Sequence, residues 1–415
     1  MRGGGTEFTS GDKVRVTLAF LSVVPLSLVL FLGIGKSSPE IVALVTSAAI
    51  IAAGYSLAWG TESLRFYVPQ VLALALLAIV QVLPEYSIEA ILSYHGAFDS
   101  TILHYATASM TGANRLLLGV GWPSVVMISY LTSRRRGEKG STFVKLDSHQ
   151  SSGVFFLTLS TVYSFVIVIK ATLTIIDAAV LVAIYASYVY AAMKSSPVDK
   201  KELENSEGTS RAISHLPRRK RYLVIPAFLA LGGFIILVGS IPFVDSILEL
   251  GRRLNINEYL LIQWLAPFLT EFPEGITVAY WATRARLAPL AVANLVSSKV
   301  NQWTLLLGTI PVAYTLALTS FQPITLTSLQ VDEILITAAQ SLYGAICLFD
   351  LKFDIREGSV LLGLFLVQFF IPPLRLEVTV VYLLLSAFEL YKTRSKIDVF
   401  SNMIMIIRGK PLGTR

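Results

Sequence analysis

The stretch EFPEGITVAYWATRARLAPLAVANLVSSKVNQW, from Glu271 to Trp303, places charged side chains inside a long apolar region. Glu271 and Glu274 lie three residues apart around a proline, and Lys299 follows in a second apolar segment. An ionisable side chain at membrane depth is costly and usually marks an ion or proton path. The stretch therefore predicts a membrane-embedded fold with a functional site inside it.

The composition extends this prediction to the whole chain. Of the 415 residues, 54% are hydrophobic and 15% are charged, whereas about a quarter of a soluble protein is charged. The apolar residues gather in runs of about 20, long enough to cross a bilayer as a helix. We expect an all-α polytopic protein of the cell membrane, in contact with the lipid bilayer. The polar start shows no signal-peptide cleavage pattern, so the first apolar run is expected to remain a helix.

About twelve transmembrane helices are expected, and the distribution of basic residues supports this count. Of the 34 lysines and arginines, 27 fall on one side of such an arrangement and five on the other. Because cytoplasmic loops carry the excess of basic residues, both termini are expected to be cytoplasmic. The eleventh span ends at Pro372-Pro373 and could instead form one broken helix with the twelfth. The expected spans are 15–34, 39–59, 66–93, 104–131, 153–170, 173–193, 222–248, 257–283, 288–318, 331–350, 357–371 and 374–391.

Several classes of protein are excluded. The single cysteine, Cys347, rules out a disulfide framework and a cysteine metal cluster. The net charge is +7, but the basic residues lie in short loops between apolar runs. They therefore indicate the orientation of the chain in the membrane, and no nucleic-acid partner is expected. There is no H-E-x-x-H or G-x-S-x-G motif, and no enzyme activity or cofactor is expected. The sequence specifies no oligomeric state.

The two halves of the chain contain similar segments. LAIVQVLPEYSIEAIL contains Pro84-Glu85, and LAPFLTEFPEGITVAY contains Pro273-Glu274. In each half a helix rich in small and polar residues follows. Each unit has five spans, an odd number, so the two units would cross the membrane in opposite directions as inverted repeats, a common plan of secondary transporters.

The expected organisation follows from these repeats. The linker between them mixes both charge signs with Ser, Pro and Gly and is expected to be solvated. The expected segments are a cytoplasmic N-terminus (1–14), an extra helix (15–34), a first repeat of spans two to six (39–193), a cytoplasmic linker (194–221), a second repeat of spans seven to eleven (222–371), a last helix (374–391) and a cytoplasmic tail (392–415).

The Pro-Glu pairs predict the chemistry of the site. A proline inside a spanning helix removes a backbone hydrogen bond and frees a carbonyl group. Such irregular backbone is tolerated at membrane depth only where it faces protein or a water-filled cavity. Carboxylates and carbonyl oxygens are the ligands of hard cations. We therefore expect the two breaks to meet near the midplane as a cation site.

Polar residues recur on one face of each predicted helix around this site. Glu271 and Glu274 share a face at i, i+3, and Glu85 and Glu89 share one at i, i+4. Polar stripes also follow the next helix in each half and are expected to face the bundle interior, although Ser and Thr there equally allow close helix packing. These stripes are Thr107, Thr111 and Asn114 in the first half, and Asn294, Ser298 and Asn301 in the second.

At these residues the sequence resembles the cation/calcium antiporter family, the sodium/calcium exchangers and their prokaryotic relatives. QVLPE (Gln81–Glu85) and TEFPE (Thr270–Glu274) are degenerate forms of the family's G-T-S-x-P-E-like motif. ASMTGAN (108–114) and ANLVSSK (293–299) are similar to its G-N-x-x-G-S-N/D-like motif. The resemblance covers spans two to eleven.

The resemblance implies roles for individual residues. Glu85 and Glu274 fall on the paired glutamates that ligate calcium, and they would be the metal ligands if Ca²⁺ is the substrate. Asn114 falls on the amide ligand of the first repeat, and Thr270 on a sodium-site threonine. The other expected cation-binding residues are Gln81, Asn294 and Ser298.

Charged residues also mark departures from the family pattern. Glu271 stands in place of a serine, and Lys299 in place of an Asn or Asp ligand. Because buried charges survive best when paired, we expect Glu271 and Lys299 to form a salt bridge that fills an ion subsite with a tethered ammonium. By the same reasoning Glu89 is the expected partner of Arg115, unless Arg115 snorkels to the interface.

These patterns predict a secondary active transporter. The resemblance implies a cation antiporter that moves Ca²⁺ or another cation against Na⁺ or H⁺ by alternating access. One alternative is a family member with an altered site that works as a Na⁺/H⁺-type antiporter, because a buried lysine can release its proton. Another is a non-transporting membrane protein that keeps the fold.

Overall fold

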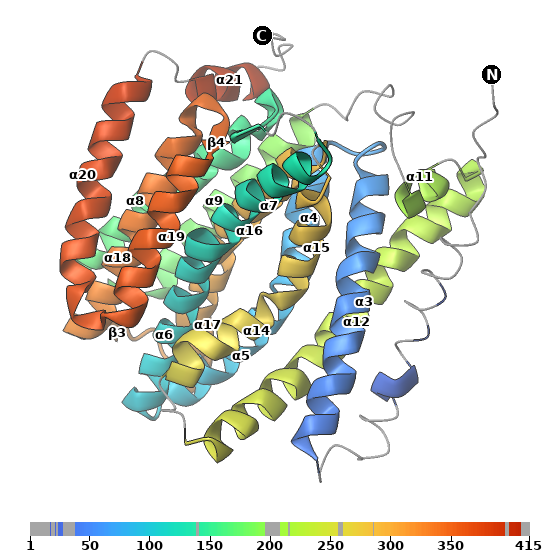
Figure 1. Ribbon diagram of the computed structural model, residues 1–415. Coiled ribbons are helices and arrows are strands. Elements are labelled where there is room, and N and C mark those ends of the chain that lie inside the picture. Colours follow the sequence, from blue (N-terminus) through green and yellow to red (C-terminus); the bar gives the residue numbers. More distant parts are fainter. Residues whose placement is uncertain are drawn as a thin grey trace, which may run out of the picture.

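The computed structural model describes residues 17, 21, 24–27, 38–137, 141–195, 208–214, 216–255, 260–284, 286–394 and 398–407. The described residues form helices packed side by side and four very short strands (Figure 1). The expected N-terminal segment 1–14 lies outside the described residues, as do most of the expected first span 15–34 and parts of the linker and tail.

The first half of the chain contains long helices, with a break between Gln81 and Leu83 and a π-helical turn that begins at Leu117. Its elements are α3 (Pro39–Leu64), α4 (Gln70–Gln81), α5 (Leu83–Gly96), α6 (Ser100–Leu116), η2 (Leu117–Gly121), α7 (Trp122–Arg135), β1 (Phe143–Lys145), η3 (Ser148–Gln150), α8 (Ser151–Lys170), β2 (Thr172–Leu173) and α9 (Ile175–Lys194).

The second half has a similar order of elements. They are α11 (Gly208–Ser214), α12 (Arg218–Arg253), η4 (Leu261–Leu265), α14 (Ala266–Thr270), α15 (Phe272–Ala282), α16 (Ala288–Asn301), η5 (Gln302–Leu306), α17 (Leu307–Leu318), β3 (Ile324–Thr325), α18 (Ser328–Cys347), η6 (Leu348–Asp350), β4 (Lys352–Asp354), α19 (Ile355–Phe370), η7 (Pro372–Leu374), α20 (Arg375–Thr393) and α21 (Asp398–Ile407).

The described helices fit a multi-pass membrane protein. Six of them are long and apolar enough to cross a membrane, and the bent pair α4 and α5 makes a seventh if it counts as one span. The count of twelve stays a prediction. The proline pair 372–373 lies in a turn between two separate helices, α19 and α20, which lie side by side (Figure 1).

Both Pro-Glu segments break a helix, as the sequence predicts. The chain bends by 48° between α4 and α5, and α14 and α15 are separated at Glu271. Pro84 and Pro273 each occupy the first turn of the following helix. A proline fits there because the first N–H groups of a helix have no partner within the helix. Glu85 and Glu274 follow directly and therefore lie beside the breaks.

The two broken helices point to opposite faces of the molecule. Strand β1 pairs with β4 at one face, and β2 pairs with β3 at the other (Figure 1). We name these the β1–β4 face and the β2–β3 face. In Figure 1, α5 lies between α4 and the β2–β3 face, whereas α15 lies between α14 and the β1–β4 face.

Helix α16 lies at the centre of the fold. Every residue from Leu290 to Asn301 is buried, and α4, α7, α8 and α15 all contact this helix. Side chains on α16 can therefore reach both halves of the chain. Three π-helical turns, η2, η4 and η5, lie in the elements around it, and such turns occur frequently at functional sites.

Candidate functional site

Glu274 is held by the polar stripe of α16. Its Oε1 accepts hydrogen bonds from Ser298 Oγ at 2.6 Å and from Asn294 Nδ2 at 2.9 Å. The same amide group of Asn294 lies 3.2 Å from Gln81 Oε1 at the end of α4. The structure thus brings four predicted site residues together from three helices, and all four are buried. Their role in cation binding stays a prediction.

Glu85 lies opposite this cluster. It is in the first turn of α5, next to Thr270 of α14, and close enough to Glu274 for their charges to interact. Its Oε2 is buried and has no hydrogen-bond partner. The two glutamates that the motifs pair are therefore neighbours in the fold, and their like charges repel each other unless a cation or protons lie between them.

Other buried oxygen atoms on or next to the elements that carry the predicted site residues also lack donors. An unsatisfied buried acceptor costs about 1–3 kcal/mol, whereas bound to a hard cation it is a good ligand. Among the described residues no three His, Cys, Asp or Glu side chains are grouped to hold a metal ion, so amide and hydroxyl oxygens would complete any cation site. Besides Glu85 Oε2, these acceptors include Asn114 Oδ1, Asn294 Oδ1 and Gln302 Oε1.

The expected salt bridge between Glu271 and Lys299 is wrong. Glu271 accepts a hydrogen bond from Gln302 Nε2 at 3.0 Å, and the Lys299 ammonium donates to the backbone carbonyl of Asn114 at 2.6 Å. No ion pair joins the two charges. One residue on an α-helix turns the side chain by about 100°, so Lys299 points away from the stripe at positions 294, 298 and 302 that faces α15.

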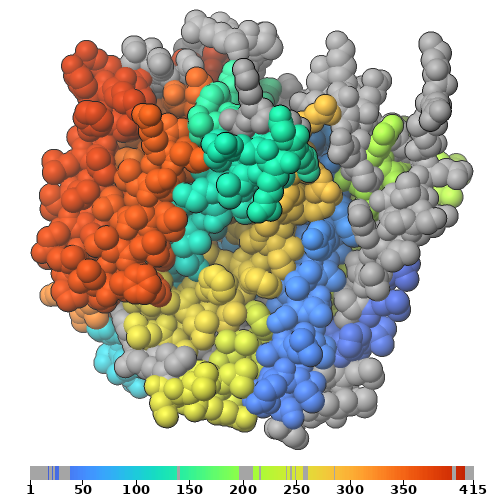
Figure 2. All heavy atoms as spheres, in the orientation of Figure 1, coloured from blue at the N-terminus to red at the C-terminus, as the bar shows by residue number. Residues whose placement is uncertain are grey.

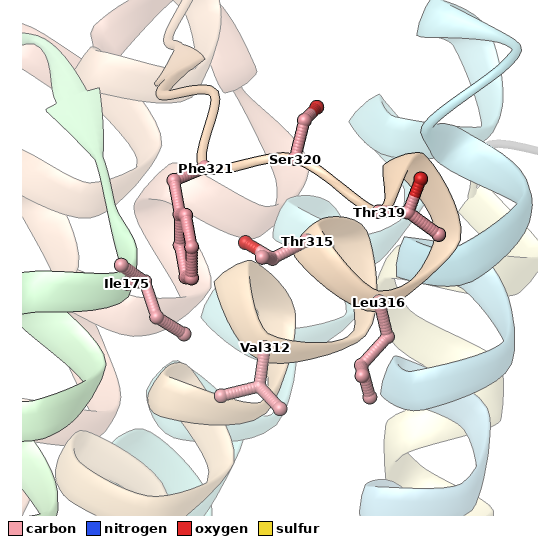
Figure 3. Close-up of a pocket in the computed structure, with 7 residues that line it drawn as sticks. All are labelled: Ile175, Val312, Thr315, Leu316, Thr319, Ser320 and Phe321. Atoms are coloured by element: carbon pink, nitrogen blue, oxygen red, sulfur yellow. The ribbon is translucent and has the colours of Figure 1, made fainter.

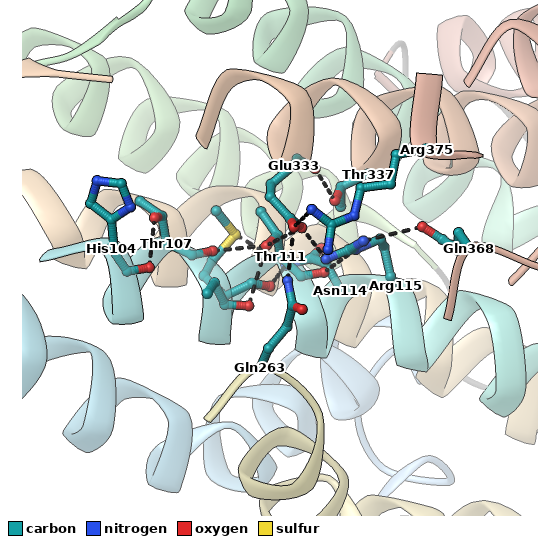
Figure 4. Close-up of polar contacts among 12 residues, drawn as sticks. His104, Thr107, Thr111, Asn114, Arg115, Gln263, Glu333, Thr337, Gln368 and Arg375 are labelled. Atoms are coloured by element: carbon teal, nitrogen blue, oxygen red, sulfur yellow. Dashed lines mark hydrogen bonds and ion pairs between the residues drawn. The ribbon is translucent and has the colours of Figure 1, made fainter. Parts of the chain in front are cut away.

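Arg115 also has a different partner from the expected one. It forms an ion pair with Glu333 of α18 and donates to Gln368 Oε1 at 3.1 Å (Figure 4). Its guanidinium lies 4.8 Å from the ring centre of Trp264. The prediction of a pair with Glu89 is therefore wrong, and Arg115 is fully buried and does not snorkel.

Glu333 is a buried charged residue that the sequence motifs do not indicate. Besides Arg115 it binds Arg375 at 2.7 Å and accepts from Gln263 Nε2 at 2.9 Å, so one carboxylate joins α6, η4, α18 and α20. The sequence feature that could have indicated it is an acidic residue near the start of the tenth expected span. It lies outside both Pro-Glu motifs, and its partners come from distant parts of the chain.

The stripe on α6 faces α18. Thr107 Oγ1 accepts from Gln330 Nε2 at 2.9 Å, and Thr111 Oγ1 donates to Glu333 at 3.5 Å (Figure 4). At the β2–β3 face His104 lies 3.5 Å from Thr327 Oγ1. Both threonines therefore join α6 to α18, which agrees with the alternative that these residues serve helix packing. On α16, Asn301 accepts from the hydroxyl of Tyr86 on α5.

A cavity of about 250 Å³ reaches Glu271 and Glu274. It follows α15 to Ala279 and α7 to Ile128, and Gly275 is exposed beside it. It thus lies near the surface where Figure 2 shows α15 between α3 and α7. Phe268 of α14 also lines the cavity, which from there extends along α15 and α7 toward the β1–β4 face.

A second cavity lies away from the glutamates. It has a volume of about 340 Å³ and is placed between the start of α9 and the end of α17, near the β2–β3 face (Figure 3). No charged side chain lines it, so it does not belong to the carboxylate site. Its lining residues are Ile175, Val312, Thr315, Leu316, Thr319, Ser320 and Phe321.

Known proteins are similar to both halves of the chain. A family model described as "Sodium/calcium exchanger protein" matches residues 41–194 and 224–372. The structure described as "Crystal Structure of H+/Ca2+ Exchanger CAX" is 33% identical, with a TM-score of 0.83, and the match covers 96% of this chain and 99% of that one. No curated protein matches the sequence.

More distant structures share the fold. The sodium-calcium exchanger NCX_Mj soaked with 2.5 mM Na⁺ and 0.1 mM Sr²⁺ is 17% identical, with a TM-score of 0.60, covering 80% of this chain and 97% of that one. The same exchanger soaked with 2.5 mM Na⁺ and 0.1 mM Ca²⁺ is 17% identical, with a TM-score of 0.57, covering 82% and 98%.

Proposed function

Because this chain belongs to the sodium/calcium exchanger protein family, we propose that it is a secondary active antiporter that moves Ca²⁺ against H⁺ or Na⁺ by alternating access. The observation that carries the proposal is the pair Glu85 and Glu274. One is held by Asn294 and Ser298, and the other keeps a buried oxygen without a donor. Similarity to a structure described as an H⁺/Ca²⁺ exchanger favours H⁺ as the counter-ion.

Charge balance at the two glutamates explains how one site would exchange two ions. Two neighbouring carboxylates carry two negative charges at membrane depth, which is costly when they are uncompensated. One Ca²⁺ cancels both charges, and so do two protons or two sodium ions. The two cargoes are then mutually exclusive, so binding of one releases the other.

We further propose that the chain is built from two inverted repeats, residues 39–193 and 222–371, within twelve spans and with cytoplasmic termini. The opposite directions of α5 and α15 support this organisation (Figure 1). The positive-inside rule then makes the β1–β4 face cytoplasmic, since the loop that contains β1 is rich in lysine and arginine. The cavity beside Glu274 would be the cytoplasmic entrance.

Lys299 supports a second candidate, a Na⁺/H⁺-type antiporter with an altered site. Its ammonium binds the carbonyl of Asn114, the residue in the amide-ligand position of the first repeat. A tethered positive charge there opposes the binding of a divalent ion. In this alternative the glutamates exchange only monovalent cations.

Reconstitution of the purified protein into vesicles tests both candidates. Ca²⁺, Na⁺ and H⁺ fluxes are measured under imposed pH or Na⁺ gradients for the wild type, Glu274→Gln and Lys299→Asp. We expect Ca²⁺ uptake by the wild type and none by Glu274→Gln. Ca²⁺ uptake only in Lys299→Asp would favour the monovalent antiporter, and no flux of any of the three ions would favour a non-transporting protein.

A further inference from the structure

Polar residues continue along α5 beyond the paired glutamates. Glu85, Glu89 and Ser93 recur at intervals of four and share one face of the helix. Their exposed fractions are 5%, 1% and 0%. Gln81 stands one interval earlier, on the other side of the break. The stripe therefore leads from the Glu274 cluster along α5 toward the β2–β3 face, opposite to the cavity.

Glu89 has no counter-charge within the described part of the chain. Its Oε2 is buried without a hydrogen-bond partner, and so is Ser93 Oγ one turn further on. Arg115, the partner expected from the sequence, is bound by Glu333 instead. An uncompensated carboxylate buried in this way is strongly unfavourable as an anion.

The groups that face Glu89 limit what it can bind. Ser109 of α6 lies beside its carboxyl group, and Glu85 is the nearest charged residue on its own helix. One carboxylate and a few hydroxyls offer fewer oxygen atoms than the six to eight that Ca²⁺ takes. A proton needs only one of these oxygens, and one carboxylate balances the charge of a monovalent cation but not that of Ca²⁺.

We propose that Glu89 is a second cation site, which binds the monovalent counter-ion between the β2–β3 face and the paired glutamates. The proposal rests on the antiport function proposed above. The counter-ion enters along the Ser93 side of α5, is held by Glu89, and passes one helical turn to Glu85 when Ca²⁺ leaves. A purely structural glutamate would instead act only through a hydrogen bond to Ser109 that joins α5 to α6.

Two transport measurements on Glu89→Gln separate these roles. The first is exchange of ⁴⁵Ca²⁺ for unlabelled Ca²⁺ across the vesicle membrane, which requires only the Ca²⁺ site. The second is net Ca²⁺ uptake driven by a pH gradient without Na⁺, or by a Na⁺ gradient at equal pH. We expect net uptake to fall by about tenfold or more while the Ca²⁺ self-exchange stays within about twofold of the wild type. The gradient that loses its effect identifies the counter-ion.

Matched variants complete the experiment. Glu89→Asp keeps the carboxylate and should keep driven uptake, and Glu62→Gln removes a buried carboxylate from α3, away from the stripe, and should keep both activities. Equal loss or equal retention of the two activities in Glu89→Gln would overturn the Glu89 site alone. A wild type without any Ca²⁺ exchange would overturn both this proposal and the proposed function.

Discussion

The Lys299 ammonium, carried by the second half of the chain, donates a hydrogen bond to the backbone carbonyl of Asn114 in the first half. The lysine is fully buried, and its charge is close enough to Glu271 for attraction without a direct ion pair. Lys299 thus places a basic group near Glu271, at the contact between the two halves of the chain, so we expect it to affect which ion binds at the neighbouring glutamates.

Replacing Lys299 by a small neutral residue should strengthen Ca²⁺ binding. Lys299 lies near Glu271, whose charge interacts with those of Glu85 and Glu274. Removing the ammonium removes its repulsion of a bound cation, and we expect the Ca²⁺ affinity of Lys299→Ser to rise by about tenfold or more. Isothermal titration of the purified protein with Ca²⁺ measures this change. Lys299→Arg keeps the charge and serves as the control; an unchanged affinity in Lys299→Ser would show that the ammonium lies outside the ion's reach.

Asn294 should contribute to Ca²⁺ affinity through Glu274. A hydrogen bond to a charged group contributes about 1.5–3 kcal/mol, so Asn294→Ala should lower the affinity by about tenfold or more. Ser297→Ala is a matched control on the same helix, because Ser297 bonds to Tyr188 and to the carbonyl of Ala293 and touches no carboxylate. Equal effects of the two substitutions would argue against a role for Asn294 at the site.

Glu333 should stabilise the helix bundle. Glu333→Gln leaves the buried Arg115 and the partly buried Arg375 without their shared anion, and breaking a buried pair costs about 3–5 kcal/mol. Thermal unfolding in detergent, followed by tryptophan fluorescence, measures the loss, and Trp264 reports directly on Arg115. Glu249→Gln breaks the exposed ion pair with Arg253 and should change little. A melting temperature as high as that of the wild type would contradict the stabilising role of Glu333.

Gly112 allows α6 to approach the π-helical turn η4. A Cβ atom at this position would overlap the backbone carbonyl of Gln263, whereas a Cβ at Gly363 of α19 would meet nothing within 4 Å. Gly112→Ala should therefore destabilise the protein by about 1–3 kcal/mol or more. Gly363→Ala should be neutral or slightly stabilising, because alanine favours a helix by about 1 kcal/mol over glycine. Equal melting temperatures for the two variants would show that α6 can move away from η4 at little cost.

The sequence predicts the helix breaks and the grouping around Glu274 because both depend on local pattern. A proline fixes each break, and spacings of three and four residues place Asn294 and Ser298 on one face. It could not predict the partners of Arg115 and Lys299. Those partners depend on how whole helices are rotated and on a helix, α18, that belongs to neither motif.

Because of the π-helical turns, the placement of the polar side chains depends on the exact number of residues in the helices that carry them. Turn η2 begins two residues after Arg115, η5 begins at Gln302, and η4 contains Gln263, so each lies next to a residue of the polar network. A π turn holds one residue more than an α turn, and each residue accounts for about 100° of rotation. Deleting a single residue in such a turn would therefore rotate one half of the helix relative to the other and swing its polar side chains off their partners. The number of residues in each of these helices therefore fixes the rotation of its two ends relative to each other, and with it the contacts of the polar side chains.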